Sequence, residues 1–485
     1  MDSSAFEHHL TSPQGRGTLP PGGATVTVGG GACCDRIRFS IALDGDAVAA
    51  AGFDAEGCGA ASAAASAAVT LVRGRTLLDA ARIGAAELAA ELGGLSPAKL
   101  HAAELAADAL ARALGAAVVE LPPAPRCAGG GRTLVAISGG VDSAVAALLC
   151  ARAGETVAVT LELWSDRDHD GERSCCSASA VAQARALAHS LELPHFTIDL
   201  RREFRAGVVE PFIDAYAAGE TPNPCVACNG HVRLDAMLAL SDRLGCGELA
   251  TGHYARTAEH EHAAGPLLRQ AADGAKDQTY MLAALPSASL ARMRFPLGEM
   301  TKPEVRQIAA DAGLPVAAKA DSQDLCFLAG TDRGSFLARH GGLGDRPGAI
   351  VDLDGNVLGR HRGQHHFTIG QRRGLGVARG EPLYVLDKQA ATGGVIVGPR
   401  SSLRATRVAI RAARLHRGGE RVDRVKLRYR SRPLAARLTG DPPAGAHAAL
   451  TVELEEPVFG AAPGQLACLM DSELVVGWGT IAPAE

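Results

Sequence analysis

The pattern of hydrophobic and polar residues predicts different structures in successive parts of the chain. Near the N-terminus, residues 26–28 and 36–43 alternate between apolar and polar side chains, which is typical of paired strands. Ala-rich segments with a helical period follow, at residues 60–72, 76–90 and 97–115. We therefore predict an α+β domain over residues 26–118, preceded by a disordered leader over residues 1–25.

From residue 132 onward, short apolar strands alternate with helices. Strands are expected at residues 133–137, 156–163 and 195–200, and helices at 141–153 and 177–191. This alternation predicts an α/β fold, with a parallel sheet covered by helices on both faces. Another helix begins at Thr301, where Glu304 completes a capping box. We assign residues 132–330 to this domain and the Gly- and Pro-rich residues 119–131 to a linker.

After about residue 331 the helical patterns stop. Short alternating runs such as GAIVDLDG, PLYVLD and GVIVG are separated by Gly, Pro and Asp. They predict two small β domains, over residues 331–399 and 400–485, and we expect the second to be a β-barrel.

Length and composition restrict the class of protein. A chain of 485 residues is too long for one ordinary core, so several domains are expected. No stretch reaches the roughly 18 apolar residues of a membrane helix, and the N-terminus has no signal-peptide pattern. We therefore expect a cytoplasmic protein without a membrane partner. Its 12 cysteines then stay reduced, so they are candidate metal ligands or reactive thiols.

The net charge of -4 is small, but its distribution is uneven. Residues 401–440 contain twelve Arg or Lys residues and only two acidic residues, Glu420 and Asp423. Such a concentration of positive charge is a candidate surface for binding nucleic-acid phosphates.

The segment AISGGVDSAVAALL, residues 136–149, joins a predicted strand to a predicted helix. Its glycines let backbone N–H groups converge on an anion, and the helix dipole and the hydroxyls of Ser138 and Ser143 favour a phosphate. The segment contains no lysine of the Walker type. The alternative interpretation is a plain Gly-Gly turn without a ligand.

Two cysteines, Cys225 and Cys228, occur in the segment TPNPCVACN. Their C-x-x-C spacing is typical of half a zinc site and equally of a reactive thiol pair. No second C-x-x-C completes a zinc site, and the remaining candidate is Cys326 in KADSQDLCF. The residues alone leave both interpretations open.

Further segments follow in order: ATGHYAR, KDQTYML, FPLGEMTKPEVRQIAADAGLPVA, DSQDLCF, HHFTIGQRRGLGV and VKLRYRSRP. Together with SGGVDS, which resembles the pyrophosphate loop of ATP pyrophosphatases, they resemble the tRNA-specific 2-thiouridylases of the MnmA/TrmU family over residues 132–482. The resemblance implies a PP-loop catalytic domain followed by two β domains, of which the C-terminal barrel binds tRNA.

The resemblance also implies a reaction. ATP adenylates the C2 oxygen of the wobble uridine of tRNA, and sulfur from a cysteine persulfide then replaces this oxygen to give 2-thiouridine. The implied cofactors are ATP and Mg²⁺. The implied partners are the anticodon stem-loop of Lys-, Glu- and Gln-type tRNAs and a cysteine desulfurase or another sulfur-relay donor.

Individual residues receive roles from the same resemblance. Cys228 corresponds to the catalytic nucleophile, and Cys326 to the cysteine that carries the persulfide. The residues implied for ATP are Ala136, Ile137, Ser138, Gly139, Gly140, Val141, Asp142, Ser143, Leu161 and Gly252. Those implied for the target base are Asn223, Pro224 and Cys225. Those implied for tRNA are His253, Lys276, Asp277, Gln278, Arg428, Tyr429 and Gln465.

Three alternatives remain. Cys225, Cys228 and Cys326 are also suited to hold a [4Fe-4S] cluster with one iron available for sulfide, in place of the persulfide. A different PP-loop pyrophosphatase, acting on a small metabolite, would use the loop but would not need Cys228, Cys326 or the Arg-rich segment. A non-enzymatic cluster carrier would not need the loop.

The N-terminal domain resembles the iron-sulfur scaffold proteins of the NifU N-terminal, or IscU-like, family over residues 26–115. The matching segments are GACCDRIRFSIAL, AEGCGAASAAASAAVTLVRGRTL and LSPAKLHAAELAADAL. The resemblance implies a site for zinc, labile iron or an iron-sulfur cluster, with the ligands Cys33, Asp35, Cys58 and His101. Ala102 replaces the family's final cysteine, and Cys34 is a candidate substitute. A structural or docking role is the alternative.

Overall fold

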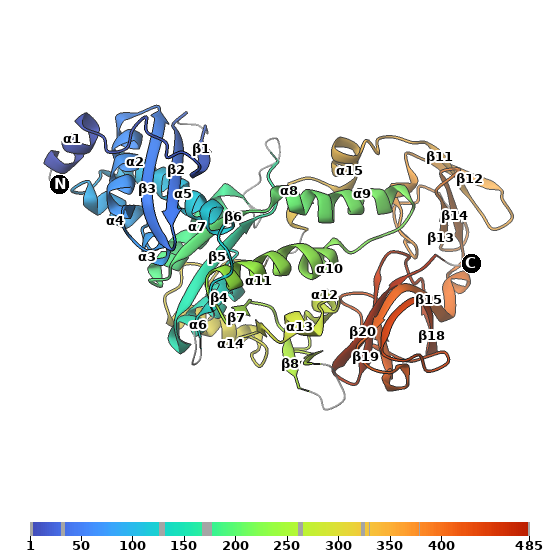
Figure 1. The fold of residues 1–485 in the computed structure, drawn as a ribbon. Coiled ribbons are helices and arrows are strands. Elements are labelled where there is room, and N and C mark those ends of the chain that lie inside the picture. The colour runs from blue at the N-terminus through green and yellow to red at the C-terminus, as the bar shows by residue number, and fades with distance from the viewer. Residues whose placement is uncertain are drawn as a thin grey trace.

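The computed structural model describes most of the chain. The described residues are 3–30, 34–125, 131–166, 177–259, 265–321, 325–328, 330–377 and 379–483. Figure 1 shows an elongated molecule, with the N-terminal domain at one end, the parallel sheet beside it and the β-rich domains at the other end. The candidate ligand Cys33 lies outside the described residues.

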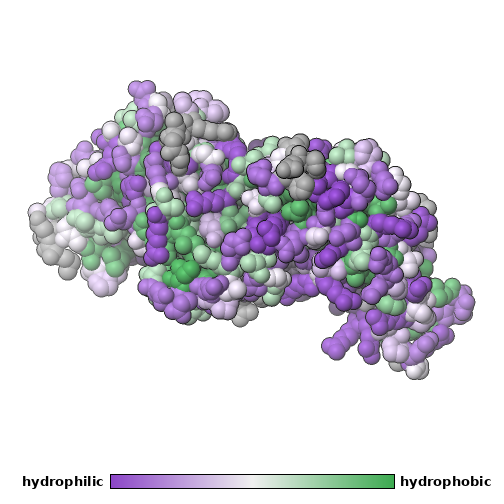
Figure 2. Space-filling model, turned by 90° about the horizontal axis from the view of Figure 1, so that it is seen from below, coloured by the Kyte–Doolittle hydropathy of each residue, from purple (hydrophilic) through white to green (hydrophobic). Residues whose placement is uncertain are grey.

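The surface and the interior differ in polarity. Figure 2 shows one face of the molecule, on which hydrophilic residues cover most of the area and hydrophobic residues form small patches. The buried apolar residues of the described chain gather in four clusters. In this part of the chain, no helix combines the length and the apolar character that crossing a lipid bilayer requires.

The N-terminal domain is a three-stranded antiparallel sheet covered by helices. The two predicted strands pair as β1 (Ala24–Gly29) and β2 (Arg36–Asp44), and a third strand that was not predicted, β3 (Ala47–Glu56), pairs with β2. Its main helices are α2 (Gly59–Val72), α3 (Leu77–Ala80), α4 (Ala85–Glu91) and α5 (Leu100–Val118). The predicted helix over residues 76–90 is thus two helices, because Gly84 is extended and caps the start of α4.

The predicted disordered leader is wrong for the part that the structure describes. Residues Ser3–Thr11 form helix α1, which packs on α2. The ring of His9 is buried, and its Nδ1 lies 2.8 Å from the Ser66 Oγ of α2. The Ser66 hydroxyl also accepts a hydrogen bond from the backbone N–H of Gln14. These contacts with a distant helix fix the segment, and the local composition could not indicate them.

The central sheet has five parallel strands in the order β10-β7-β4-β5-β6. They are β4 (Thr133–Ala136), β5 (Thr156–Glu162), β6 (His195–Asp199), β7 (Glu248–Ala250) and β10 (Met293–Arg294). Its helices include α6 (Val141–Ala153), α7 (Ala178–Ser190), α11 (Leu234–Arg243) and α14 (Lys302–Asp311). From β4 the chain builds one side of the sheet and then returns to build the other. A ligand crevice is expected where the order reverses, at the carboxyl ends of β4 and β7.

Two long helical runs extend from the sheet toward the β-rich end (Figure 1). The first contains α8 (Arg201–Phe204), η2 (Arg205–Val209) and α9 (Glu210–Ala217), and the second α10 (Pro224–Ala227), η3 (Cys228–Arg233) and α11. Both η2 and η3 are π-helices, which are rare and often mark functional sites. They pack closely, because a Cβ at Gly207 of η2 would lie 2.7 Å from Val232 Cγ2 of η3.

The C-terminal third contains two sheets, as predicted. The first has the order β12-β11-β14-β13, with β11 (Gly348–Val351), β12 (Val357–His361), β13 (Tyr384–Gln389) and β14 (Gly394–Gly398). The second contains β15 (Arg404–Leu415), β16 (Arg424–Lys426), β17 (Leu434–Leu438), β18 (Gly445–Phe459), β19 (Leu466–Asp471) and β20 (Leu474–Ile481). Because β15 pairs with both β18 and β20, these six strands close into the predicted barrel.

Two features near these sheets were not predicted. A further helix, α15 (Arg333–Gly341), follows the point at which we expected helices to stop, and it is capped by Asp332, which accepts a hydrogen bond from the Ser335 N–H. The hairpin of β8 (Arg256–Ala258) and β9 (Leu267–Arg269) leaves the parallel-sheet domain and extends the barrel sheet beside β20. Strands of three residues are too short to show an alternating pattern.

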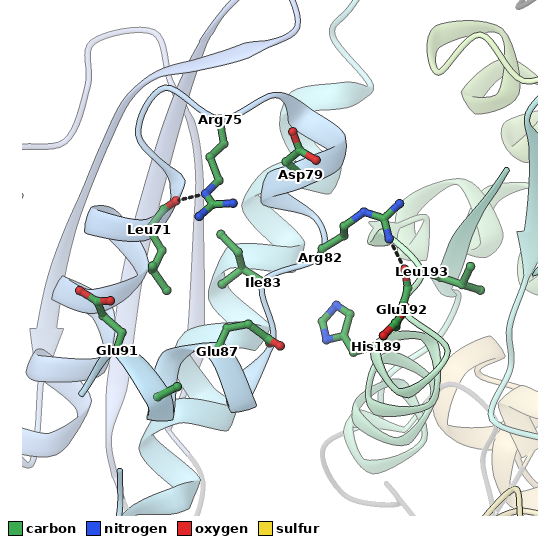
Figure 3. Close-up of a pocket in the computed structure, with 11 residues that line it drawn as sticks. Leu71, Arg75, Asp79, Arg82, Ile83, Glu87, Glu91, His189, Glu192 and Leu193 are labelled. Carbon is green, nitrogen blue, oxygen red and sulfur yellow. Dashed lines mark hydrogen bonds between the residues drawn. The ribbon is translucent and has the colours of Figure 1, made fainter. Parts of the chain in front are cut away.

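The N-terminal domain and the parallel sheet share one hydrophobic core. The backbone N–H of His195, in the edge strand β6, donates to the carbonyl of Ala81 at 2.9 Å. Between α3, α4 and α7 a cavity of about 590 Å³ remains, and at its rim Arg82 donates to the carbonyl of Glu192 (Figure 3). The two domains therefore meet across a packed interface.

Helix α5 runs antiparallel to the strands of the sheet. After α5 the chain reaches the end of α11, where the Ala124 N–H donates to the Asp242 carbonyl at 2.8 Å. Because α11 leads into β7, this contact lies near the start of β7. Further back in α5, Arg112 pairs with Glu162, the last residue of β5. His101 precedes Arg112 by three helical turns, which is about 16 Å along the axis. The N-terminus of α5 therefore points past the carboxyl edge of the sheet.

Candidate active site

The loop between β4 and α6 is closed by the side chain of Ser143. Its hydroxyl accepts from the Ser138 N–H at 3.1 Å and donates to the Gly140 carbonyl at 3.0 Å. Gly139 has a φ of 71°, a conformation that favours glycine, and Gly140 is the N-cap of α6. The N–H groups and the positive dipole end of α6 thus face the loop, an arrangement that binds phosphate.

Gly252 forms a second wall of this loop. It follows β7, and a Cβ at this position would lie 2.7 Å from the Ser143 nitrogen, so there is no room for a side chain. Leu161 approaches from the end of β5, the other neighbour of β4. The structure therefore brings the residues implied for ATP together at three adjacent strands, where the strand order reverses.

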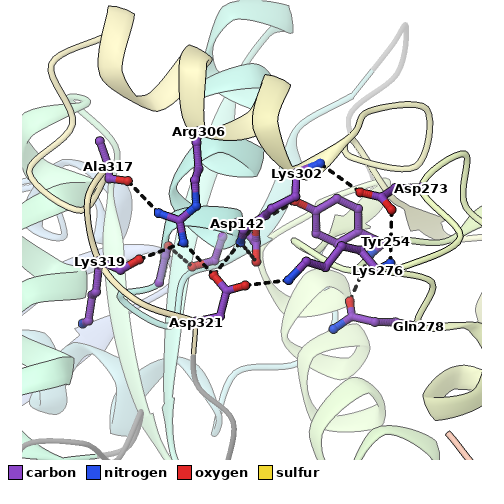
Figure 4. Close-up of polar contacts among 12 residues, drawn as sticks. Asp142, Tyr254, Asp273, Lys276, Gln278, Lys302, Arg306, Ala317, Lys319 and Asp321 are labelled. Carbon is purple, nitrogen blue, oxygen red and sulfur yellow. Dashed lines mark hydrogen bonds and ion pairs between the residues drawn. The ribbon is translucent and has the colours of Figure 1, made fainter. Parts of the chain in front are cut away.

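Charged side chains from distant parts of the sequence surround Asp142, in the first turn of α6. Lys302 Nζ lies 2.7 Å and 2.8 Å from its two carboxylate oxygens (Figure 4). The same Nζ lies 2.8 Å from Asp321, which also pairs with Lys276 at 2.7 Å. Burial alone would raise the pKa of Asp321, but the hydrogen bonds from Lys276 and Lys302 lower it to about 2. The Asp321 carboxylate is therefore ionised at neutral pH. Asp142 is held beside the ammonium group of Lys302.

Most residues of this cluster were not predicted from the sequence. We call it the Asp142 cluster, and its members are Asp142, Tyr254, Asp273, Lys276, Lys302, Arg306, Lys319 and Asp321. Several of them lie in motifs that carry the family resemblance, such as ATGHYAR and TKPEVR. No local pattern connects these motifs to the nucleotide loop, because the contacts form only when the sheet is assembled.

The C-x-x-C pair lies where a short helix becomes a π-helix. Asn223 caps α10, since its side-chain oxygen accepts from the Cys225 N–H at 3.1 Å, and Pro224 takes the first helical position. Cys225 is half-buried, whereas Cys228, which begins η3, is 8% exposed. The three residues implied for the target base therefore stand together, one helical turn before the implied nucleophile.

Cys326 begins the 3₁₀ turn η4 (Cys326–Leu328) and is half-buried. The next residue, Phe327, anchors this turn. Its buried ring has its centroid 5.1–6.5 Å from those of four other rings, Trp164, Phe204, Phe212 and Phe336. Cys228 belongs to the same hydrophobic core, and Cys326 packs against that core.

Metal-ligating side chains converge at one place in the described part of the chain. The ligand atoms of Asp35, Cys58 and His101 lie within 4.8 Å of one another, and no other described group of three meets this distance. The sulfurs of Cys225, Cys228 and Cys326 therefore do not converge in this way. The structure adds no support to the alternative of a cluster held by these three cysteines.

The Asp35 carboxylate organises the N-terminal group. It accepts from the Cys58 N–H at 2.7 Å, and its second oxygen lies 3.1 Å from Cys58 Sγ and 3.3 Å from His101 Nε2. The hydrogen bonds from Cys58 lower the pKa of Asp35. Gly57 permits this approach, since a Cβ there would lie 2.1 Å from Asp35 Oδ1. A carboxylate, a thiol and an imidazole form a donor set that fits zinc or iron.

Residues implied for tRNA lie where the barrel meets the parallel-sheet domain. The buried carboxylate of Asp277 pairs with Lys426 of β16 at 3.3 Å. Gln465 Nε2 donates to the carbonyl of Thr221, in the loop before α10, at 2.5 Å. The Asp277 side chain therefore joins the barrel to the parallel-sheet domain, and Gln465 joins it to the loop that carries the residues implied for the target base.

The other residues of this group also have partners within the chain. Gln278 accepts from the Tyr254 N–H at 3.0 Å, and Arg428 donates to the Gly460 carbonyl. Burial lowers the pKa of His253 to about 3, so its imidazole is neutral at physiological pH. A neutral ring can contact RNA through a hydrogen bond but not as a cation.

The Arg-rich segment is partly a structural feature of the barrel. Seven of its twelve basic residues form ion pairs: Arg411, Arg417, Arg421, Arg424, Lys426, Arg432 and Arg437. The side chain of Arg417 is 3% exposed and pairs with Asp471 at 3.0 Å. Arg404 and Arg407, by contrast, are exposed on β15. Only part of this charge is therefore available to an RNA.

The domains match known protein families. Residues 131–330 match the tRNA methyl transferase HUP domain, residues 334–399 the tRNA methyl transferase PRC-barrel domain and residues 401–481 the aminomethyltransferase beta-barrel domain. Residues 2–117 match the NifU-like N-terminal domain. This last match includes α1, in agreement with its packing on α2.

One of the relatives matches along almost the whole chain, and others match its larger part. A bifunctional protein NifU/MnmA of Rubrobacter xylanophilus is 44% identical over 98% of this chain and 97% of its own length. The tRNA-specific 2-thiouridylases MnmA of Sorangium cellulosum and Chloroflexus aggregans are 42% and 43% identical. These two matches cover 75% and 73% of this chain and 95% and 98% of the relatives. The chain therefore belongs to the tRNA-specific 2-thiouridylase family and carries a NifU-like domain at its N-terminus.

Proposed function

We propose that this protein uses ATP to activate the C2 oxygen of the wobble uridine in tRNA and then replaces that oxygen with sulfur, giving 2-thiouridine. The observation that carries the proposal is a physical connection between the nucleotide loop and the two implied cysteines. Asp321, five residues before Cys326, is bonded to the cluster around Asp142 of the loop. Cys326 in turn packs on the hydrophobic core that contains Cys228.

The first step forms a leaving group. The uracil C2 oxygen attacks the α-phosphorus of ATP, the bond between the α and β phosphates breaks, and pyrophosphate leaves. The N–H groups of the Ser138–Ser143 loop stabilise the charge on the phosphates. Mg²⁺ bound with ATP would neutralise part of that charge, and Asp142 is the carboxylate of the loop that would hold it.

The second step transfers sulfur. The terminal sulfur of a Cys326 persulfide attacks C2 of the activated base, and AMP leaves with the former C2 oxygen. The Cys228 thiolate then attacks the Cys326 sulfur, which forms a Cys228–Cys326 disulfide and releases 2-thiouridine. Cellular thiols reduce the disulfide. The sulfur comes from a cysteine desulfurase or another relay donor, and the reducing cytoplasm suits this cycle.

Recognition of the tRNA would involve the barrel and the loop before α10. The barrel supplies exposed arginines such as Arg404 and Arg407 on β15. Asn223, Pro224 and Cys225 would lie against the extruded base, next to the contact between Gln465 and Thr221. The expected substrates are the anticodon stem-loops of Lys-, Glu- and Gln-type tRNAs.

The experiment measures two products with the purified full-length protein. With ATP, Mg²⁺, an anticodon stem-loop containing a wobble uridine and a desulfurase with cysteine, we expect pyrophosphate release and 2-thiouridine, the latter detected by mass spectrometry. A stem-loop with cytidine at the wobble position is the control and should give neither product. Pyrophosphate release without RNA, driven by a small metabolite, would contradict the proposal and favour a different pyrophosphatase.

We also propose that the N-terminal domain binds a zinc or iron ion through Asp35, Cys58 and His101. The convergence of these donors supports it. The antiparallel course of α5 places His101 on the carboxyl side of the sheet, the side that carries the nucleotide loop. Its proposed role is to supply sulfur to the catalytic domain or to tune sulfur delivery. Ala102, in place of the family's final cysteine, is fully buried and offers no ligand.

Anaerobic metal analysis tests this second role. The full-length protein should retain about one zinc or iron, which Cys58→Ser should remove. Cys34→Ser is the matched control, since Cys34 is exposed and lies outside the converging group. Iron with acid-labile sulfide that survives Cys58→Ser but is lost in Cys225→Ser would instead favour a cluster at the catalytic cysteines.

A further inference from the structure

The nucleotide loop contains no lysine, but the fold brings Lys302 and Lys319 to it and Lys276 to the neighbouring Asp321. The chain has only six lysines among its 49 Lys and Arg residues, and half of them, Lys276, Lys302 and Lys319, belong to the Asp142 cluster. Elsewhere the chain uses arginine almost throughout. Lysine side chains, each a compact ammonium group on a flexible stem, are thus concentrated beside the loop. Their point charges can contact a phosphate oxygen there.

Lys302 is held with little freedom. It takes the first position of α14, whose start is fixed by the capping box of Thr301 and Glu304. Its backbone N–H donates to Asp273 at 3.0 Å, and its side chain is 9% exposed. From this position its Nζ reaches both oxygens of Asp142, so Lys302 fixes the orientation of the one carboxylate that the loop contains.

Lys319 approaches the loop from the other side and is exposed. Its Nζ donates to the carbonyl of Gly139 at 2.9 Å and lies 3.1 Å from the side-chain oxygen of Gln183 on α7. Both partners are neutral, so the ammonium charge is not neutralised by these bonds. A phosphate at the loop would offer this group a charged partner in place of a carbonyl.

The charge balance of the Asp142 cluster favours an anion. It contains four cations, Lys276, Lys302, Arg306 and Lys319, against three carboxylates, Asp142, Asp273 and Asp321. In Figure 4 the side chains of Lys276, Lys302 and Arg306 converge on Asp142 and Asp321, and Lys319 meets Arg306 through its backbone carbonyl. An excess of positive charge beside a helix N-terminus is suited to a polyphosphate.

We propose that Lys319 is a phosphate-binding residue of the nucleotide site, which contacts the pyrophosphate end of ATP, and that Lys302 is a positioning residue that orients Asp142. The loop itself has no lysine, and these two lysines, from residues 302–319, supply the positive charge that it lacks. This inference rests on the proposed function, because it names residues for the polyphosphate of the same ATP site. The other source of phosphate is the tRNA backbone, and the test separates the two.

The experiment measures binding of magnesium pyrophosphate to the full-length protein by calorimetry, without tRNA. Lys319→Met should weaken this binding by about tenfold or more, the loss expected for one charge-assisted hydrogen bond. Its affinity for the anticodon stem-loop should stay within about twofold of the unmodified protein, because the lysine serves ATP. Lys99→Met, in the N-terminal domain, is the matched control and should change neither affinity.

Lys302 needs a readout that separates positioning from folding. Lys302→Arg keeps the charge and should retain more pyrophosphate binding than Lys302→Met. In a double-mutant cycle, the effects of Lys302→Met and Asp142→Asn on pyrophosphate binding should not add, since one acts through the other. Melting temperatures identify variants that fail to fold. If Lys302→Met is one of them, the arginine variant and the Lys319 measurement still decide.

Two outcomes overturn the inference. One is pyrophosphate binding by Lys319→Met that equals that of the unmodified protein. The other is normal pyrophosphate binding with a loss of stem-loop affinity, which would assign Lys319 to the tRNA backbone. Pyrophosphate release dependent on tRNA is measured in parallel on the unmodified protein. Its absence would contradict the proposed function, whereas its presence with unaffected Lys319→Met binding would contradict only this inference.

Discussion

Gly115 of α5 lies so close to Thr197 of β6 that a Cβ at position 115 would stand 2.0 Å from the Thr197 carbonyl oxygen. The contact joins the NifU-like domain to the edge strand of the catalytic sheet. The guanidinium of Arg112, one turn earlier in α5, pairs with Glu162 of β5. The two domains are therefore united by α5, and not merely connected by the chain between them.

We expect Gly115→Ala to destabilise the protein. In an isolated helix this change would stabilise by about 1 kcal/mol, but here the new methyl group meets a backbone oxygen that cannot move alone. The net loss should be about 1–3 kcal/mol in the free energy of unfolding, measured with urea. Gly247→Ala is the control, because nothing lies within 4 Å of a Cβ there. Equal stability of the two variants would show that α5 is not tightly docked.

A fragment that begins at Gly131 should be poorly soluble. Without α5, the side of β6 that it covers loses its apolar partner, and Glu162 loses Arg112. An unpaired, partly apolar edge strand promotes aggregation. Soluble yield and light scattering of the fragment and the full-length protein give the comparison. A monomeric fragment with the melting temperature of the whole protein would contradict the shared core.

The stability of the central β domain should depend on pH through Lys388. This lysine is 8% exposed, and burial lowers its pKa from 10.5 to about 8. Between pH 8 and 10.5 the unfolded chain binds more protons than the folded one, so stability rises with pH across this window. Below pH 8 Lys388 is charged in both the folded and the unfolded chain, so its unfavourable contribution to the free energy of unfolding no longer changes with pH.

Removal of that charge gives a direct check. Lys388→Met should raise the free energy of unfolding at pH 7 by about 1–3 kcal/mol, because the gain from the charge exceeds the lost bond to the Phe367 carbonyl. The difference from the unmodified protein should shrink toward pH 10.5. Urea titrations at pH 7 and pH 10 measure both. A gain that is independent of pH would mean that Lys388 is not charged when buried.

Binding of tRNA should depend strongly on salt. If about six basic groups meet phosphates, affinity falls about 10³-fold between roughly 50 and 200 mM salt. Replacement of Arg404 and Arg407 together by Met should reduce the slope by about two units, since both are exposed on β15. Arg417→Met should leave the slope unchanged, because Arg417 is buried against Asp471. If Arg417→Met reduced the slope and the double replacement did not, the RNA would bind another surface of the protein.

Cys228 and Cys326 should each be needed for sulfur transfer but not for activation. Cys228→Ser and Cys326→Ser should each stop formation of 2-thiouridine while pyrophosphate is still released in the presence of tRNA. Cys246→Ser is the control, since Cys246 is buried in the core beside Leu244 and has no implied role. Mass spectrometry of the RNA and a pyrophosphate assay report the two steps separately. Normal thiolation by either variant makes that cysteine structural.

Local sequence patterns predicted the elements whose cause is local. The helix at 141–153 begins after the Gly-Gly turn, and the capping box at Thr301 starts α14, both where the patterns indicated. The barrel followed from alternating runs. Elements that depend on distant partners were missed: α1 needs Ser66 of α2, and the β8–β9 hairpin needs β20.

The candidate site divides in the same way. Motifs drew attention to the loop and the cysteines, because each of these motifs consists of a few consecutive residues. Lys302 and Lys319 were not identified, because their contacts with Asp142 and Gly139 exist only after the chain has folded. The twelve-residue charge run also predicted more available charge than the barrel offers, since a sequence does not show which arginines find carboxylates.

Because α5 packs on β6, the two fused domains are held in a fixed arrangement and are not simply tethered by a linker. In a tethered pair, the encounter frequency of two sites falls as the linker lengthens. In this molecule the separation of the Asp35–Cys58–His101 group from the catalytic edge is set by a packed core, and insertions into residues 119–131 would leave it unchanged. Anything passed between the two sites must therefore cross a fixed distance, at a rate independent of protein concentration and of linker length.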